Sequence, residues 1–355
     1  MNIVTDVCYQ YTESDDKSMI KRYGKEVDMR TINRDLDQIK ETAKNARKRM
    51  DIYTKFGKQR DKCPMCGSME ARKFLKVYDK YQYLQCKNCG GLYLEEYPNI
   101  EEMYSSNDMV ALTTEYIDND IFYKRLNMIS KPKVDFVMDI CKENGLSIKF
   151  WLDVGCGGGE IPYYLIHELG IKAEGIETNP LEIQFARDKG ITVYEKYVDI
   201  HETDQEINAI INRQDCVSII NMLEHVEEPA ELIAFLHQKM EKDTVLVFEV
   251  PKHPALASFA NMTSKDNIYR HITPPVHLQI FSIDAIQIML ENKFEVLATW
   301  EFGQGFNDLL HNAMILSEQD ENQLYIDLQR CSNKIQKAID ECGYGDQIVV
   351  VAKKK

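Results

Sequence analysis

The sequence predicts an α/β protein whose C-terminal part is a parallel, helix-covered sheet, preceded by a small metal-binding module and a helical segment. From residue 148 onward, short apolar segments alternate with amphipathic segments of helical spacing, which is typical of a parallel sheet. Upstream, four cysteines form two Cys-x-x-Cys pairs, which is a metal-ligand spacing. The 355 residues, 44% of them hydrophobic, suffice for one large core and a satellite domain.

These signals divide the chain into four parts. Residues 1–60 are predicted to be mostly helical, because apolar residues recur at near-helical spacing and proline is absent. Residues 61–98 hold the cysteines and short aromatic strands, and residues 99–147 return to helical periodicity as a lead-in. Residues 148–355 are predicted to form the α/β domain, with a helical insertion at about 306–342.

The end of the first segment is basic. Five cationic side chains stand close together, at Lys40, Lys44, Arg47, Lys48 and Arg49. Such a run is either a solvated helix face or a surface for an acidic partner, and the solvated face is the simpler interpretation.

The cysteine module is predicted to bind a structural zinc ion through Cys63, Cys66, Cys86 and Cys89. Four soft ligands on two tight turns match tetrahedral zinc, and four thiolates leave no position for a catalytic water. The ion would therefore stabilise a domain with little core of its own. Redox activity of a Cys-x-x-Cys pair is the alternative.

Seven strands are expected in the α/β domain. They are the segments IKFWLDV, KAEGIE, TVYEK, CVSIIN, TVLVFEV, FEVLATWEF and QIVVVAK. The first of them leads into WLDVGCGGGE, where four glycines within five residues precede a predicted helix. Glycines at a strand-to-helix turn let backbone N–H groups approach a ligand, although such a turn can also serve packing.

The second strand ends at Glu177, about twenty residues after the glycines, where a carboxylate can accept both hydroxyls of a ribose. The loop lacks the Gly-Lys-Ser/Thr of a Walker loop, and Glu160 at the predicted helix start is poorly suited to a pyrophosphate. A nucleoside without phosphates therefore fits the pattern best.

These segments resemble class I S-adenosylmethionine-dependent methyltransferases. LDVGCGGGE is similar to their first motif, GIETNP to the acidic end of their second strand, and CVSIINMLEHVEEPAEL to their fourth strand with its Glu-His. FEVPKHP, PPVHLQIFSIDAIQIMLENKFEVL and GDQIVVVAKK resemble the later strands, and the cysteine-rich lead is similar to that of many bacterial methyltransferases. The resemblance covers residues 148–355 and implies a Rossmann-like, seven-stranded sheet with helices on both faces.

Matched position by position, the resemblance implies a site for S-adenosylmethionine. Its residues would be Asp153, Gly155, Cys156, Gly157, Glu177, Thr178, Asn179, Val198, Asp199, Asn221 and Met222. Glu177 would hold the ribose, Val198 and Asp199 would border the adenine, and the residues after the fourth strand would line the methionine side. The third-strand region YEKYVDIHETDQ matches the family least well.

Histidines at strand ends are the candidate bases. A sulfonium methyl is already activated, so the enzyme must hold an acceptor in line and remove its proton. His225, His277 and His253 are predicted for this task, with His225 favoured because it should lie closest to the methyl. A structural histidine is the alternative at each position, and Glu224 with His225 could instead bind a divalent ion.

The predicted function is methyl transfer to a small hydroxylated acceptor, with a sugar, nucleotide sugar or glycan as the first choice by association. Methylation of a carbon atom, of RNA or of a protein is an alternative within enzymes, and a non-catalytic module that keeps the cofactor fold is the alternative outside them. Methylation of planar nitrogens loses support because NMLE stands where an Asn-Pro-Pro-Tyr-like tetrad would be expected.

Charge and hydropathy restrict the partners. With 43 basic and 57 acidic residues, the net charge of −14 disfavours extended contact with nucleic acid or anionic membranes. No stretch of about 18 apolar residues occurs, and the N-terminal residues lack a signal-peptide pattern. A cytoplasmic location without a membrane partner is therefore expected, and the sequence gives no indication of the oligomeric state.

Overall fold

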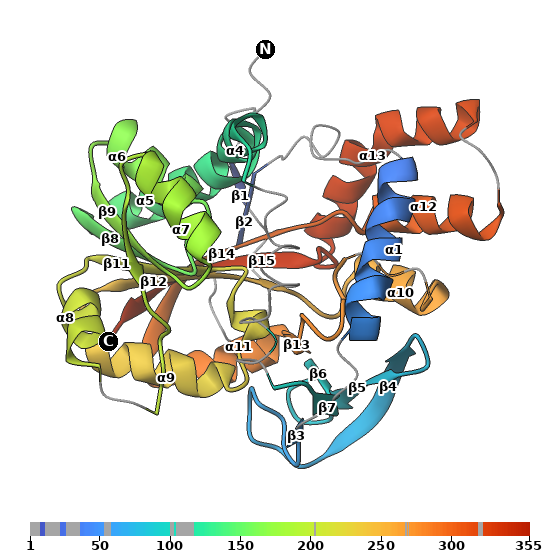
Figure 1. Cartoon of the computed structure of the whole chain (residues 1–355), viewed down its shortest axis with the longest axis horizontal. Coiled ribbons are helices and arrows are strands. Elements are labelled where there is room, and N and C mark those ends of the chain that lie inside the picture. Colours follow the sequence, from blue (N-terminus) through green and yellow to red (C-terminus); the bar gives the residue numbers. More distant parts are fainter. Residues whose placement is uncertain are drawn as a thin grey trace.

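A nine-stranded sheet is the centre of the protein in the computed structural model (Figure 1). The structure describes residues 8–10, 22–25, 36–52, 58–99, 103, 117–201, 204–266, 268, 270–318 and 322–355. The strand order in the sheet is β1-β2-β14-β15-β12-β11-β8-β9-β10. Seven of these strands are the seven expected from the sequence: β8 (Phe150–Val154), β9 (Lys172–Glu177), β10 (Thr192–Glu195), β11 (Cys216–Ile220), β12 (Val245–Pro251), β14 (Phe294–Phe302) and β15 (Gln347–Lys354).

The pairing within the sheet confirms the predicted fold class. The five strands from β8 to β12 are parallel to their neighbours, and β15 enters antiparallel between β12 and β14. All seven residues of β12 are buried, as expected for a strand whose two faces are both covered. The apolar run therefore marks the middle of the sheet.

Helices cover both faces of the sheet. One core joins it to α8 (Gln205–Asn212), α9 (Pro229–Lys239) and α11 (Ile283–Leu290). A second core, on other residues of the same strands, joins it to α4 (Asn119–Arg125), η3 (Leu126–Ser130), α5 (Lys131–Glu143) and α6 (Glu160–His167). The helix α7 (Pro180–Asp188) packs near β10 in a smaller cluster. None of the described helices is long and apolar enough to cross a membrane.

Helix starts are encoded locally. Asn179 accepts a hydrogen bond from the Leu181 N–H at the start of α7, and Pro180 occupies its first turn. Ser282 accepts one from Ala285 at the start of α11. These hydrogen bonds determine where α7 and α11 begin, and therefore where the loops before them stop.

The cysteine module has its own sheet, of order β13-β6-β5-β4. Its strands are β4 (Ala71–Val77), β5 (Tyr81–Cys86), β6 (Leu92–Leu94) and β13 (Gln279–Ile280), and a short pair, β3 (Lys58–Gln59) with β7 (Glu96–Tyr97), lies beside it. The strand β13 belongs in sequence to the α/β domain, so the module is completed by a strand from outside residues 61–98. A two-residue strand carries too little pattern for the sequence to reveal this pairing.

Of the N-terminal segment, the part that the structure describes contains one helix and short strands. The helix α1 (Leu36–Ile52) buries Leu36, Ile39 and Ala43 and exposes Lys40 and Lys44, which agrees with a solvated basic face.

Two stretches expected to be helical are strands instead. They are β1 (Cys8–Gln10) and β2 (Arg22–Lys25), and β2 extends the main sheet beside β14. Unpaired backbone groups at a sheet edge favour an added strand over the local helical pattern. The remaining residues before position 36 lie outside the described ranges.

The predicted insertion consists of two helices, α12 (Gly305–Leu316) and α13 (Gln323–Glu341). They lie on the right of Figure 1, together with α10 (Leu256–Thr263), which packs against α12. The insertion thus extends the carboxyl-edge side of the sheet, where β14 ends and β15 begins.

Candidate active site

The glycine loop turns β8 into α6 with backbone angles that side chains rarely adopt. Gly155, Gly157 and Gly159 have φ angles of +73°, +52° and +85°. At Gly159 a Cβ atom would also lie 2.5 Å from the Ile191 side chain. The loop is therefore both strained for other residues and tightly packed against β10.

Glu177 joins this loop to the end of β9. One carboxylate oxygen accepts the Gly157 N–H at 3.0 Å, and the other accepts the N–H groups of Thr178 and Asn179 at 2.7 and 3.0 Å. The carboxylate is thus oriented by backbone donors before any ligand binds. It occupies the position that the sequence assigns to ribose recognition.

Three further predicted residues lie at this edge of the sheet. Asp153 is buried, accepts a hydrogen bond from the Ser218 hydroxyl at 2.5 Å, and has its pKa raised by burial to about 7. The Met222 side chain, after β11, lies over Gly155, where a Cβ would meet its Cγ at 3.2 Å. Asn221, beside it, is exposed and has a φ of +51°. The ends of β8, β9 and β11 therefore meet at one place.

Other predicted cofactor residues direct their side chains elsewhere. Cys156 packs into the apolar cluster around α7, and Val198 belongs to the core under the sheet. The Asp199 carboxylate accepts the His201 N–H at 2.8 Å, and the Asn179 side chain caps α7.

Glu182 was missed by the sequence analysis. It lies on the first turn of α7, with a carboxylate oxygen 3.9 Å from the Cβ position of Gly157. Burial raises the pKa of this carboxyl to about 8, and nearby Glu177 and Glu160 add to the rise. An acidic residue in the turn after Asn-Pro was the available signal. The loop is thus surrounded by several carboxyl groups.

Three candidate proton-handling groups lie together beyond the end of β11. One oxygen of Glu224 and one nitrogen each of His225 and His277 lie within 4.8 Å of one another. The two rings are 5.1 Å apart in an edge-to-face arrangement. Glu224 lies in the short 3₁₀ helix η4 (Leu223–His225) and is buried, whereas both histidines are partly exposed. The structure therefore brings together two of the three predicted bases.

The tautomers of these histidines follow from their partners. The Nδ1 of His225 lies 2.8 Å from the Val276 carbonyl, and that of His277 lies 2.6 Å from the His271 carbonyl. A carbonyl only accepts, so Nδ1 carries the hydrogen, and Nε2 is the basic nitrogen of each neutral ring. Burial lowers the pKa of both imidazoles, so both are neutral near pH 7.

His253, the third predicted base, lies in a different set of contacts. Its Nδ1 is 3.0 Å from the Ser258 hydroxyl, its Nε2 is 3.2 Å from the Gln85 side chain, and its ring packs edge-on against Phe74. Burial lowers its pKa to about 4. These contacts favour the structural alternative at this position.

A buried ion pair near Glu224 was also missed. Lys133 on α5 and Glu249 on β12 are in contact, and both are at most 5% exposed. Burial raises the pKa of the Glu224 carboxyl to about 8; Glu249 adds to this rise and Lys133 opposes it. A charged residue inside the apolar strand TVLVFEV was the available signal.

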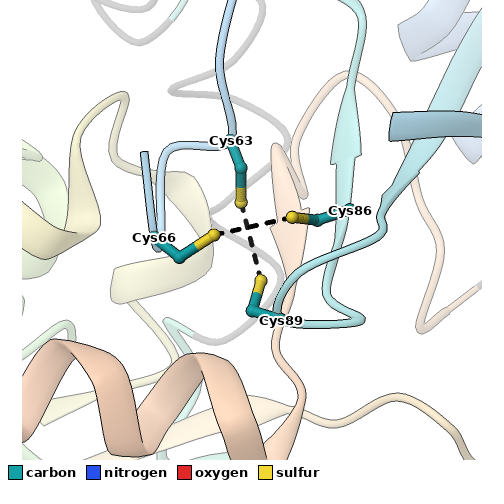
Figure 2. Close-up of side chains that lie close together, drawn as sticks. All are labelled: Cys63, Cys66, Cys86 and Cys89. Atoms are coloured by element: carbon teal, nitrogen blue, oxygen red, sulfur yellow. Dashed lines mark hydrogen bonds between the residues drawn. The ribbon is translucent and has the colours of Figure 1, made fainter. Parts of the chain in front are cut away.

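The four cysteines of the module converge on one point (Figure 2). The Sγ atoms of Cys63 and Cys89 are 3.7 Å apart, and those of Cys66 and Cys86 are 3.5 Å apart. Bonds of about 2.3 Å to a tetrahedral zinc ion place sulfur atoms about 3.8 Å apart. The geometry of the donors thus fits the predicted ion.

Part of the chain is similar in sequence to known methyltransferases. Residues 131–298 match the sequence model of a family described as "Methyltransferase domain". The chain is 30% identical over 131 residues to a ubiquinone biosynthesis O-methyltransferase of Actinobacillus pleuropneumoniae serotype 7, covering 36% of this chain and 55% of that protein. It is 24% identical over 155 residues to a mitochondrial ubiquinone biosynthesis O-methyltransferase of Schizosaccharomyces pombe, and this match covers 43% of this chain and 56% of that protein.

The chain thus spans about half the length of these curated relatives. Among solved structures, it is similar to a SAM-dependent methyltransferase from Archaeoglobus fulgidus, with a TM-score of 0.43 and 20% identity over 67% of this chain and 100% of that one. The family match spans the glycine loop, Glu177 and the Glu224–His225 turn. Residues 131–298, which are just under half of the chain, are therefore similar to a methyltransferase domain.

Proposed function

We propose that the protein transfers a methyl group from S-adenosylmethionine to a hydroxyl of a small acceptor, with a sugar, nucleotide sugar or glycan as the first class to test. One observation carries the proposal: Glu177 and Met222, at the ends of β9 and β11, both contact the glycine loop, and His225, three residues after Met222, lies beside His277. Carboxyl ends of parallel strands share one edge of a sheet, which is where ligands bind in such folds.

The cofactor would lie across the glycine loop. Glu177 would accept the ribose hydroxyls, the loop backbone would border the amino-acid part, and Met222 would line the methionine side. S-adenosylmethionine carries a positive sulfonium, and the Glu177 carboxylate beside the loop would favour such a ligand. Asp153 would hold the loop in place through Ser218.

The histidines would handle the proton of the acceptor. As the acceptor oxygen forms its bond to the methyl carbon, the carbon–sulfur bond breaks and its electron pair stays on sulfur, which yields S-adenosylhomocysteine. His225 Nε2 takes the hydroxyl proton, and His277 packs against its ring. His253, with its buried partners, would support the surrounding loop.

We also infer that Cys63, Cys66, Cys86 and Cys89 hold a structural zinc ion. Support comes from the sulfur spacing and from the closed set of four thiolates. The ion would supply a cross-link between two turns and no chemistry of its own.

The relatives support oxygen as the methylated atom, because their names describe O-methyltransferases. The choice of a sugar as the first acceptor to test comes from association. Methylation of carbon, RNA or protein, and binding without catalysis, remain the competing outcomes.

The test is a methyl-transfer assay with pooled acceptors. The purified protein is incubated with S-adenosylmethionine and with nucleotide sugars, glycosides, catechols, RNA or protein, and S-adenosylhomocysteine and methylated products are measured by mass spectrometry. A methylated sugar hydroxyl is expected. His225→Ala should lower turnover by about 10²- to 10⁴-fold, whereas His237→Ala, on α9, should have no effect. Equal activity of the two variants, or turnover of RNA or protein alone, would contradict the proposal.

A further inference from the structure

The short strand β13 connects the cysteine module to the segment that carries His277, which lies beside His225. This strand begins two residues after His277, yet it pairs with β6 of the module. Gln279 lies opposite Tyr93, and Ile280 lies opposite Leu92. His277 therefore stands just before a strand that is part of the module's sheet.

Tyr83, on β5 of the module, holds the backbone at His277 directly. Its side chain is fully buried, and its hydroxyl donates to the His277 carbonyl at 2.5 Å. At the next residue, Leu94 N–H donates to the Leu278 carbonyl at 2.9 Å, and Leu278 N–H donates to the Glu224 carbonyl at 2.8 Å. The module thus holds the His277 segment, which in turn holds the turn that carries His225.

Gln279 extends the same connection to His225. Its buried side-chain amide donates to the carbonyls of Leu223 and Val226, both at 2.8 Å. These two carbonyls lie on either side of Glu224 and His225 in the chain. The backbone of both histidine segments is therefore fixed by groups of the module's sheet.

The cysteine cluster lies at the far end of these strands. Cys86 ends β5, and Cys89 lies in the turn that leads to β6. The Cys89 carbonyl accepts the hydroxyl of Ser282, which follows β13. An ion on the four thiolates would fix this turn, and with it the alignment of β5, β6 and β13.

We propose that the cysteine module and its metal position His225 and His277 for methyl transfer, through the positioning residues Tyr83 and Gln279. The module acts on the chemistry without touching either substrate. The inference rests on the proposed function for the task of the histidines. Glu177 and Gly157 are held by bonds between the ends of β8 and β9, so cofactor affinity should not depend on the module.

Nuclear magnetic resonance of the full chain, labelled with ¹⁵N-histidine, tests this without knowledge of the acceptor. Ring nitrogens report the tautomer and surroundings of each histidine, and His225→Gln and His277→Gln variants assign their signals. Tyr83→Phe removes one hydroxyl. Tyr81→Phe is the matched control, because it removes the hydroxyl of another buried tyrosine on the same strand.

The proposal predicts that the His225 and His277 signals shift or broaden in Tyr83→Phe and in wild-type protein treated with 1,10-phenanthroline and a reductant. Added zinc should restore the wild-type spectrum. The His237 signals should keep their wild-type positions. The affinity for S-adenosylhomocysteine, measured by calorimetry, should stay within about twofold of wild type. Tyr81→Phe should leave both active-site signals in place.

Two results would overturn the proposal. One is unchanged His225 and His277 signals in both Tyr83→Phe and the chelated protein; the other is an equal change in Tyr81→Phe, which would indicate general packing. If no form bound S-adenosylhomocysteine, the proposed function would fail, while the histidine spectra would still decide the positioning role.

Discussion

Glu224 is a buried carboxyl group whose titration should be visible in the stability of the protein. Burial raises its pKa to about 8, from 4.5 for an exposed glutamate. Between these pH values the folded state keeps a proton that the unfolded state has lost. The free energy of unfolding therefore falls as pH rises from about 4.5 to 8, by at most about 5 kcal/mol from this group.

Glu224→Gln removes this titration and keeps the shape of the side chain. We expect the variant to gain stability relative to wild type as pH rises across this window, and the difference to level off above pH 8. Urea unfolding of both proteins at several pH values measures it. Parallel stability curves would show that Glu224 is ionised in the folded protein.

At the scale of residues, local motifs were predictable and partners from distant parts of the chain were not. The glycines and Glu177 lie within one strand-turn-helix unit and the strand that follows, so their spacing is visible in the sequence. Gln279 and the Lys133–Glu249 pair acquire their partners from elements far apart in the chain, such as α5 and β12. Periodicity and spacing do not indicate which distant residues become partners.

The helical insertion is tied to the sheet by one buried charge cluster. Arg270 donates to Asp308 on α12 and to Asp346 just before β15, and both carboxylates are at most 2% exposed. Removing the arginine would leave two buried carboxylates without their cation.

Arg270→Ala should therefore lower the free energy of unfolding by about 3–5 kcal/mol. The matched control is Arg330→Ala on α13, whose pair with Asp327 is exposed and should contribute less than about 1 kcal/mol. Denaturant unfolding of both variants measures the difference. Similar values for the two would mean that the cluster does not anchor the insertion.

At the scale of elements, long buried strands were predictable and short ones were not. The strands from β8 to β15 that form the main sheet were recognised because segments of four to nine residues, rich in apolar side chains, alternate with segments of helical spacing. The pairing of β13 with β6, and of β2 with β14, depends on which sheet edge lies near. Two to four residues are too few to encode that choice.

At the scale of the whole molecule, the cysteine module shares a core with the α/β domain. Cys63, Cys86 and Cys89 pack in the same cluster as residues of β11 and β12. Loss of the ion should therefore destabilise more than the module itself, because metal binding and folding are coupled.

We expect one zinc ion per chain, and a melting temperature lowered by roughly 5 °C or more in Cys86→Ser or after chelation. Cys331→Ser, at an exposed position on α13, is the control and should leave both values unchanged. Elemental analysis and differential scanning calorimetry provide the readouts. A metal-free protein with an unaltered melting temperature would refute the structural ion.

The glycine loop and Glu177 are proposed to form a nucleoside site. The most direct test is calorimetric titration of S-adenosylhomocysteine into wild-type protein, Glu177→Ala, and Glu195→Ala. Glu195 lies opposite Glu177 on the neighbouring strand and is exposed, so it is the matched control. We predict micromolar binding to wild type and Glu195→Ala, and affinity at least about tenfold weaker for Glu177→Ala. If none of the three proteins bound S-adenosylhomocysteine, or if all three bound it equally well, the glycine loop and Glu177 would not form a nucleoside site.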